Sequence, residues 1–132
     1  MARMERRRIS SGGPYEARYG YSRALVVDHA CWVSGTTDAG PDGRSLHPGD
    51  PAAQARAVLD IIEQALHDAG FARADVVRIR IFTTDMKRSP AILAVLGERF
   101  GAIGPAATIV EVKSLIEPSL LVEIEADAVR DG

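Results

Sequence analysis

The alternation of side chains near the C-terminal end is the feature that most narrows the choice of fold. In the run Leu120–Val129, apolar and acidic residues take turns, with Glu123, Glu125 and Asp127 on one side. A period of two places successive side chains on opposite faces of a β-strand. The run therefore predicts a strand with one buried face and one acidic face. The three carboxylates fit either a solvated sheet face or a polar cleft or subunit interface.

Other strands are predicted wherever short runs are rich in apolar and β-branched residues. These runs are Arg23–Val27, Ala30–Ser34, Asp75–Thr84 and Ala107–Val112. The first two flank Asp28-His29 and predict a hairpin. The polar stretch 36–49 is predicted to be a long loop that shapes a site.

Two segments carry the signals of amphipathic helices. Asp50-Pro51 combines an N-cap aspartate with a proline suited to the first helical position, and Gly70 supplies the C-terminal stop. Ser89-Pro90 repeats the pattern for a second helix that ends near Gly101. Each helix has one apolar stripe, so both are expected on one face of a sheet. The predicted order is β-β-α-β-α-β-β, a two-layer α+β sandwich.

This layering assigns strand residues to the two faces of the sheet. The residues expected under the helices are Val77, Ile79, Ile81, Val122 and Ile124. Those expected on the opposite face are Val76, Arg78, Arg80, Phe82, Ile109, Glu123 and Glu125. Charges that lose water need partners, so a face that mixes apolar groups with opposite charges suits a subunit interface.

Composition limits the class of protein. A chain of 132 residues, 46% hydrophobic and 26% charged, fits one globular domain over 1–132. The formal net charge of −2 argues against nucleic acid as a partner. No apolar run reaches the ~18 residues that span a membrane, and no apolar stretch follows the N-terminal arginines. We expect a cytoplasmic protein without membrane contact.

The N-terminal segment 1–13 is predicted to be a flexible arm. It carries Arg3, Arg6, Arg7 and Arg8, and a short charged tail has nothing to bury. The alternative is a basic arm that binds an acidic partner.

No short catalytic motif is present. His29, His47 and His67 are scattered without metal-ligand spacing, so no metal site is predicted. Cys31 lies in an apolar run and is expected to be a buried, inert thiol. Glu123 and its neighbours are the acid-base candidates that are left.

Several motifs together resemble the RidA/YjgF reactive-intermediate deaminase family, also described as endoribonuclease L-PSP-like. They are Tyr21-Ser22, Trp32-Val33-Ser34-Gly35, Asp75-Val76-Val77, Thr83-Thr84-Asp85, Pro105-Ala106 and Val122-Glu123-Ile124-Glu125-Ala126. The resemblance begins near residue 14. It implies a chorismate-mutase-like subunit, a homotrimer with small-molecule clefts between subunits, and cofactor-independent hydrolysis of enamines or imines to a keto acid and ammonia.

The resemblance also assigns roles to residues. It places the glutamate that positions or activates water at Glu123, and the cleft-lining tyrosine and serine at Tyr21 and Ser34, with Gly35 alongside. The family arginine that binds the substrate carboxylate falls on Ala107, because Pro-Ala-Arg is replaced by Pro-Ala-Ala. The chain thus resembles a branch without this arginine, for which standard 2-iminobutanoate deamination is not expected.

Three functions stay open at this point. The first is a hydrolase or deaminase that acts on a different reactive metabolite, with Arg78 or Arg80 as a possible replacement cation. The second is a non-catalytic ligand-binding or chaperone-like trimer. The third is the ribonuclease activity of some relatives, against which the net charge argues.

Overall fold

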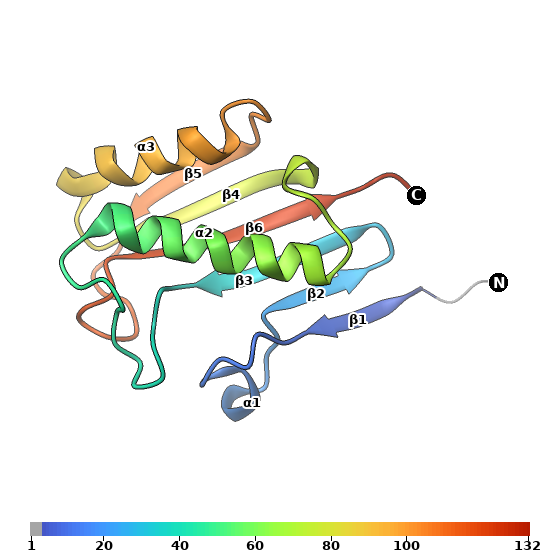
Figure 1. Cartoon of the computed structure of the whole chain (residues 1–132), viewed down its shortest axis with the longest axis horizontal. Helices are drawn as coiled ribbons and strands as arrows, with labels where there is room; N and C mark the ends of the chain where they lie inside the picture. The colour runs from blue at the N-terminus through green and yellow to red at the C-terminus, as the bar shows by residue number, and fades with distance from the viewer. Residues whose placement is uncertain (1–3) are drawn as a thin grey trace.

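The computed structural model describes residues 4–132 as one mixed sheet with two long helices across one face (Figure 1). The strands are β1 (Arg6–Ile9), β2 (Ala24–Val27), β3 (Ala30–Thr36), β4 (Val76–Thr83), β5 (Ala106–Glu111) and β6 (Val122–Val129). The helices are α1 (Glu16–Tyr19), α2 (Pro51–Asp68) and α3 (Ser89–Phe100), with 3-10 turns at Arg73–Asp75 and Met86–Arg88. The predicted two-layer α+β architecture is confirmed.

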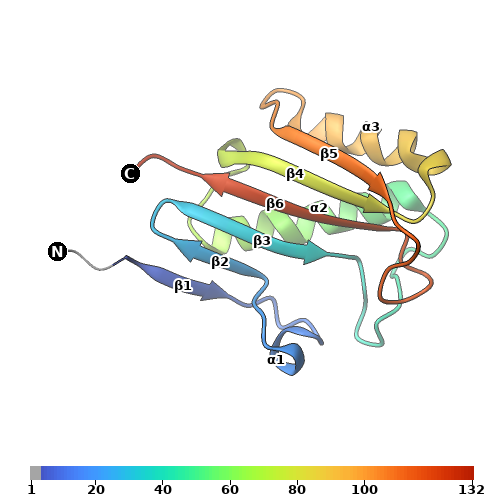
Figure 2. The same cartoon turned by 180° about the vertical axis from the view of Figure 1, so that it is seen from behind.

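The C-terminal strand lies inside the sheet. The strand order is β1-β2-β3-β6-β4-β5, in which only the β4–β5 pair is parallel. Strand β6 therefore pairs with both β3 and β4. Seen from behind, the other face of the sheet has no long helix across it (Figure 2). This open face carries the acidic side chains of β6.

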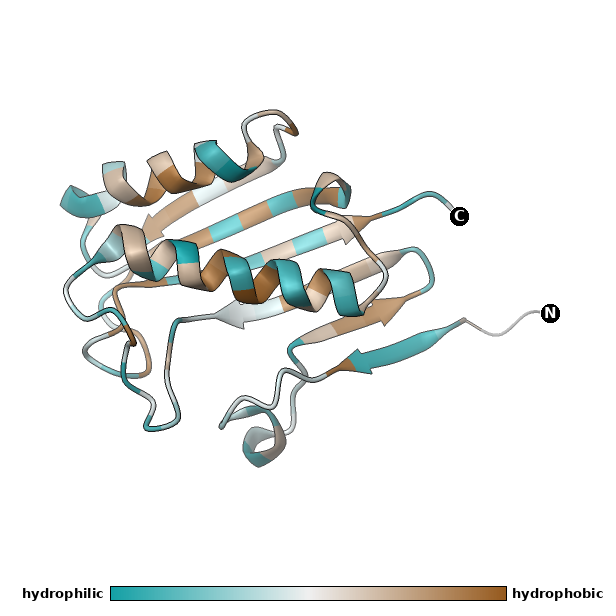
Figure 3. Ribbon diagram, in the orientation of Figure 1, coloured by the Kyte–Doolittle hydropathy of each residue, from teal (hydrophilic) through white to brown (hydrophobic). Residues whose placement is uncertain are grey.

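The core lies between the sheet and helices α2 and α3. The alternation predicted for β6 is confirmed, because Val122, Ile124, Ala126 and Ala128 are buried. Figure 3 shows the apolar and polar residues alternating along the central strands. The sheet-facing stripe of α2 closes the core and is formed by Ala55, Val58, Leu59, Ile62 and Leu66. At ~25 cal/mol per Å² of apolar surface, this burial is the main stabilising contribution.

The helix ends follow the predicted signals at α2 and at the C-terminal end of α3, where Gly101 follows the last helical residue, but the predicted serine cap of α3 is wrong. The Asp50 side chain accepts a hydrogen bond from the Ala53 N–H at 3.0 Å, and Gly70 has a positive φ of 85° just past the end of the helix. At the second helix, Ser89 is the first helical residue and not its cap. Asp85 instead caps the preceding 3-10 turn by accepting from the Lys87 N–H at 3.1 Å.

One predicted strand face is wrong at two positions. Val76 is buried and Val77 is 46% exposed, the reverse of the prediction. A register shift between Val76 and Arg78 against β6 accounts for this, since one extra residue on a strand exchanges its faces. Ile109 is also misplaced, because it pairs with Ile81 and packs against the helix-side core.

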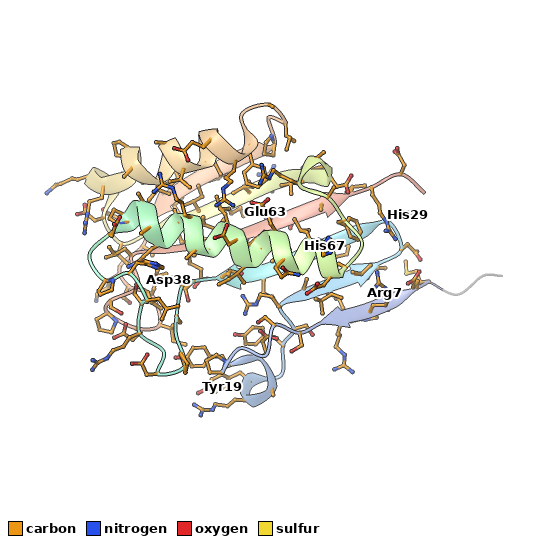
Figure 4. The ribbon with its side chains drawn as sticks, in the orientation of Figure 1. Arg7, Tyr19, His29, Asp38, Glu63 and His67 are labelled. Atoms are coloured by element: carbon orange, nitrogen blue, oxygen red, sulfur yellow. The ribbon has the colours of Figure 1, made fainter. Side chains whose placement is uncertain are left out.

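The prediction of a flexible arm over 1–13 is wrong for Arg6–Ile9, which form β1 and pair with β2. Arg7 donates to the Ala69 carbonyl oxygen at 2.7 Å, close to the end of α2 that carries His67 (Figure 4). A cation is favourable at a helix C-terminus, where carbonyl groups lack partners. Met1 to Arg3 lie outside the described residues. The chain also forms α1, which the predicted element order omitted.

Candidate functional site

A cavity of about 390 Å³ lies where β3 and β6 meet the segment that precedes β2. Four of the five residues singled out by the sequence line it: Tyr21, Ser34, Gly35 and Glu123. They come from three separate parts of the chain, so the fold brings them together. A larger hollow of about 960 Å³ covers the open sheet face and shares Tyr21 and Ser34, but Glu123 does not line it.

A bulge in β3 forms the wall opposite Glu123. The register against β6 shifts between Val33 and Thr36, so Ser34 and Gly35 lie at an irregular point of the ladder. A Cβ atom on Gly35 would collide with the carboxylate of Glu123. Bulges often redirect side chains next to functional sites. Gly35 is therefore needed because the Glu123 carboxylate lies directly against its backbone.

The Glu123 carboxyl is in an environment that disfavours its charge. Burial raises its pKa above the ordinary value, and repulsion from Glu125 adds to the rise, while Arg23 opposes it. Within residues 4–132, no protein group donates a hydrogen bond to this carboxylate. A half-buried carboxyl with a raised pKa and unused acceptor positions is suited to exchange protons with a bound molecule.

Arg23 is the cation of this cavity. Its side chain is 9% exposed, and Nη1 donates to the Gly35 carbonyl oxygen and to Thr36 Oγ1, each at 2.8 Å. Nη2 donates to the Tyr21 hydroxyl at 3.4 Å, and the guanidinium lies over the Tyr21 ring at 5.6 Å. Arg23 therefore connects β3 to the tyrosine that covers the site.

Glu16 is the counter-ion of Arg23. Its Oε2 lies 3.5 Å from Arg23 Nε, and both side chains are at least nine-tenths buried. Glu16 also accepts hydrogen bonds from Ser10 Oγ at 3.2 Å, from the Ser11 N–H at 3.1 Å and from Ser11 Oγ. Although burial raises its pKa, the Ser11 bonds, Arg23 and Ser10 outweigh this and hold the pKa of Glu16 below its ordinary value.

The predicted site-shaping loop is held by a buried aspartate. Asp38 Oδ2 accepts from Ser45 Oγ at 2.7 Å and from the His47 N–H at 3.1 Å, and it lies 3.2 Å from His47 Nδ1. These bonds fix the loop whose residues Thr37 and Ala39 line the cavity. Such side-chain-to-backbone bonds define loop shape where no strand ladder does.

The structure does not bring Ala107 to this cavity. Ala107 is exposed on β5, the edge strand, and β4 separates β5 from β6. Neither predicted replacement cation lines the cavity. Arg80 instead pairs with Glu125 at 3.3 Å and Asp127 at 3.4 Å.

Other chemistries find little support in the described part of the chain. Cys31 is fully buried, and burial raises the pKa of its thiol to about 11. No cluster of three or more His, Cys, Asp or Glu side chains within residues 4–132 is arranged to hold a metal ion. No helix in the same range has the length and apolar character needed to cross a membrane.

The two charged residues Glu16 and Arg23 line the cavity but are not among the predicted site residues. Arg23 begins a run whose pattern predicts only a strand. Its position two residues after Tyr21 and next to a small residue, Ala24, was the available signal. Glu16 follows a Ser-Ser-Gly-Gly-Pro-Tyr stretch, and nothing in that pattern indicates which charge it meets.

The fold and cavity define a small α+β protein with a cavity of about 390 Å³ that is lined by a half-buried carboxylate and a buried arginine. The family model described as Endoribonuclease L-PSP matches residues 14–130. The chain therefore belongs to this family, the RidA/YjgF family named from its sequence motifs, and it has the chorismate-mutase-like fold of that family.

Relatives with names or solved structures are similar over most of their length. The 3-aminoacrylate deaminase RutC of Acinetobacter baylyi is 37% identical over 108 residues, 82% of this chain and 85% of that protein. Rv2704 of Mycobacterium tuberculosis, a YjgF/YER057c/UK114 family member, is 45% identical with a TM-score of 0.87, covering 96% of this chain and 100% of that one. The YjgF gene product of E. coli is 29% identical with a TM-score of 0.81, covering 95% and 99%.

Proposed function

We propose that this chain hydrolyses a small, reactive imine or enamine at the Glu123 cavity and that it does not use 2-iminobutanoate as its standard substrate. The observation that carries the proposal is the Glu123 carboxyl, whose pKa is raised by burial and which faces a cavity of about 390 Å³. The similarity to a 3-aminoacrylate deaminase supports the same reaction class. The reaction needs no cofactor.

In this proposal Glu123 moves the protons. Water adds to the carbon of the C=N bond, and Glu123 takes the proton of the water and passes it to the nitrogen. The carbinolamine then collapses: its hydroxyl proton moves to the departing nitrogen, the C–N bond breaks, and a carbonyl compound and ammonia are released. A carboxyl with a raised pKa suits both water addition and carbinolamine collapse. It is a stronger base than an ordinary glutamate and is re-protonated more readily.

The test is ammonia release from imines generated in situ by an amino-acid oxidase or amine oxidase. We expect turnover in the wild type, loss of about 10²-fold or more in Glu123→Gln, and little change in Glu125→Gln. If Glu125→Gln abolished turnover and Glu123→Gln did not, the assignment would be wrong. Ligand binding without turnover in any imine would instead support the non-catalytic, chaperone-like alternative.

We further propose that the chain forms a homotrimer through the open sheet face. Trp32 is 47% exposed and pairs across the strands with Leu25, beside the ion pair of Arg80 with Glu125. Light scattering should give three times the subunit mass of 14.2 kDa. Trp32→Glu should shift that mass to the monomer, and a wild-type monomer at micromolar concentration would exclude the trimer.

Such an assembly gives Ala107 a role at a cleft between subunits, where the β5 edge of one copy would meet the Glu123 cavity of another. An arginine there would supply the bidentate partner of a substrate carboxylate. Loss of such a partner typically costs about 2–5 kcal/mol, or about thirty- to several-thousand-fold. Ala107→Arg should therefore increase turnover of 2-iminobutanoate by at least about thirtyfold. An unchanged rate would remove Ala107 from the site.

Ribonuclease activity, which the family description names, is not the function we propose. The formal net charge is −2, and Arg23, the one cation that lines the cavity among residues 4–132, is already paired with Glu16. RNA binding needs cations available for phosphates.

A further inference from the structure

The charges lining the Glu123 cavity are unusual for a site that takes anions. The lining residues with a formal charge are Glu16, Arg23 and Glu123. When both carboxylates are ionised, these described residues give the cavity a net charge of −1. The charge that an incoming ligand meets therefore depends on whether the Arg23 guanidinium has bonding capacity to offer.

Arg23 has little such capacity. Its Nη1 donates to the Gly35 carbonyl oxygen and to Thr36 Oγ1, and its Nη2 donates to the Tyr21 hydroxyl. Its Nε faces Glu16 Oε2 at 3.5 Å. A guanidinium binds a carboxylate well when two parallel N–H groups point at it. In this protein the Nε side of the Arg23 guanidinium faces the Glu16 carboxylate, so that side is not free to bind the carboxylate of a ligand.

Glu16 is held in that position by a dedicated set of donors. Ser10 and Ser11 donate three hydrogen bonds to its carboxylate, and the side chain is 5% exposed. A Cβ atom on Gly13 would lie 2.9 Å from Glu16 Oε2, so the glycine leaves space for the carboxylate. A buried carboxylate with these partners is ionised and fixed, not a mobile surface group.

We propose that Glu16 is a built-in anion that occupies Arg23 and thereby restricts the cavity to uncharged or cationic substrates. A substrate carboxylate would have to displace Glu16 from a fully hydrogen-bonded position or lie between two carboxylates. An imine or enamine without a carboxylate does not need to displace Glu16 and is not repelled by the two carboxylates. A protonated iminium gains from the nearby Glu123. Glu16 is in this sense a specificity-determining residue, and Arg23 is a latent carboxylate-binding site.

This inference rests on the proposed function only in taking the cavity as the substrate site, and binding alone tests it. Propanoate and propanamide form a matched pair of probes, equal in shape and different in charge. Binding is followed by the backbone amide NMR signals of Gly35 and Thr36 during titration of the wild-type protein. We expect the wild type to bind propanamide more tightly than propanoate. Equal or tighter binding of propanoate would overturn the proposal without the need for any variant.

Variants then test whether Glu16 is the cause. Glu16→Ala opens space beside Arg23 and should bind propanoate at least about tenfold more tightly than the wild type, as expected for a charge-assisted hydrogen bond. Binding of propanamide should change less than twofold. The double variant Glu16→Ala/Arg23→Gln should lose the gain. If Glu16→Ala does not fold, Glu16→Gln keeps the shape, removes the charge, and should show a smaller gain of the same sign.

A surface carboxylate provides the matched control. Glu98 pairs with Arg56 at 3.6 Å on the helical layer, and its side chain is 59% exposed. Glu98→Ala should leave propanoate binding unchanged. A gain in Glu98→Ala, or a gain that persists in the double variant, would contradict the proposal. Failure to hydrolyse any imine would count against the proposed function and would leave these binding results as they stand.

Discussion

The two ends of the open face of β6 carry the same type of side chain in different surroundings. At one end, Glu125 and Asp127 share Arg80, and all three side chains are at least one-quarter exposed. At the other end, Glu123 accepts no hydrogen bond from the described chain and lies in a cavity with the buried Glu16–Arg23 pair. Glu123 and Glu125 are two positions apart, with only Ile124 between them, so strand geometry alone does not distinguish them.

The difference comes from what covers each end. Segment 10–23 borders the cavity at the Glu123 end and partly buries it, whereas nothing within residues 4–132 covers the Arg80 end with a comparable segment. Burial makes charges expensive unless they are paired, and it makes an unpaired one chemically responsive. Chain segments that are distant in the sequence therefore determine which carboxylate of an alternating strand becomes half-buried and has a raised pKa.

The largest predicted effect comes from breaking the buried pair. Arg23→Ala should lower the free energy of unfolding by about 3–5 kcal/mol, because it leaves the Glu16 carboxylate buried without its counter-ion. The measurement is urea denaturation at one fixed protein concentration, with the slope of the transition checked against the wild type.

Arg56→Ala is the control for that measurement. Arg56 also forms an ion pair, but its side chain is 51% exposed, and such pairs contribute about 1 kcal/mol or less. Similar losses in Arg23→Ala and Arg56→Ala would mean that burial of the Glu16–Arg23 pair does not cause the larger loss of stability.

The second prediction concerns the wall that places Glu123. Gly35→Ala would push a methyl group into the Glu123 carboxylate and should cost only about 1 kcal/mol, the low end for overpacking, because the group that must move is the far end of a flexible side chain. Any turnover or ligand binding should fall with it, since the carboxylate must move. Gly97→Ala is the matched control. Gly97 lies inside α3 with no atom within 4 Å of an added Cβ, so alanine should stabilise by about 0.5–1 kcal/mol.

Sequence patterns predicted the covered face of the sheet better than the open one. Helix α2 and the buried side of β6 follow local periodicity, which depends on residues close in sequence. The faces of Val76 and Val77 were wrong because a bulge leaves no mark in hydropathy. Arg7 was assigned to a flexible arm because its acceptor, the Ala69 carbonyl, lies 62 residues away.

The residues of the candidate site also form two groups, those that sequence motifs predict and those that only the fold reveals. Tyr21, Ser34, Gly35 and Glu123 were found through family motifs, and the structure places them in one cavity. Glu16 and Arg23 were missed, since their importance depends on burial and on each other. Pairing of charges across a loop is a tertiary property, and neither composition nor spacing encodes it.

The smallest predicted effect separates Glu123 from Glu125 directly. A raised carboxyl pKa means that folding favours the protonated form, so this contribution to stability is present below the ordinary value of 4.5 and is lost as pH rises through the raised pKa. Glu123→Gln should therefore be more stable than the wild type at pH 8, with the difference shrinking toward pH 4. Thermal unfolding at the two pH values measures it.

Glu125→Gln is the comparison variant for Glu123→Gln, and the stability gain at pH 8 is not expected for it. It removes a partner of Arg80 and should give no gain in stability at pH 8. Because repulsion from Glu125 is the second cause of the raised pKa of Glu123, the substitution should also lower that pKa. An NMR titration of the Glu123 side-chain carboxyl carbon in both proteins would show it. An unchanged titration midpoint would mean that burial alone sets the pKa, and that the two ends of the strand face are electrostatically independent.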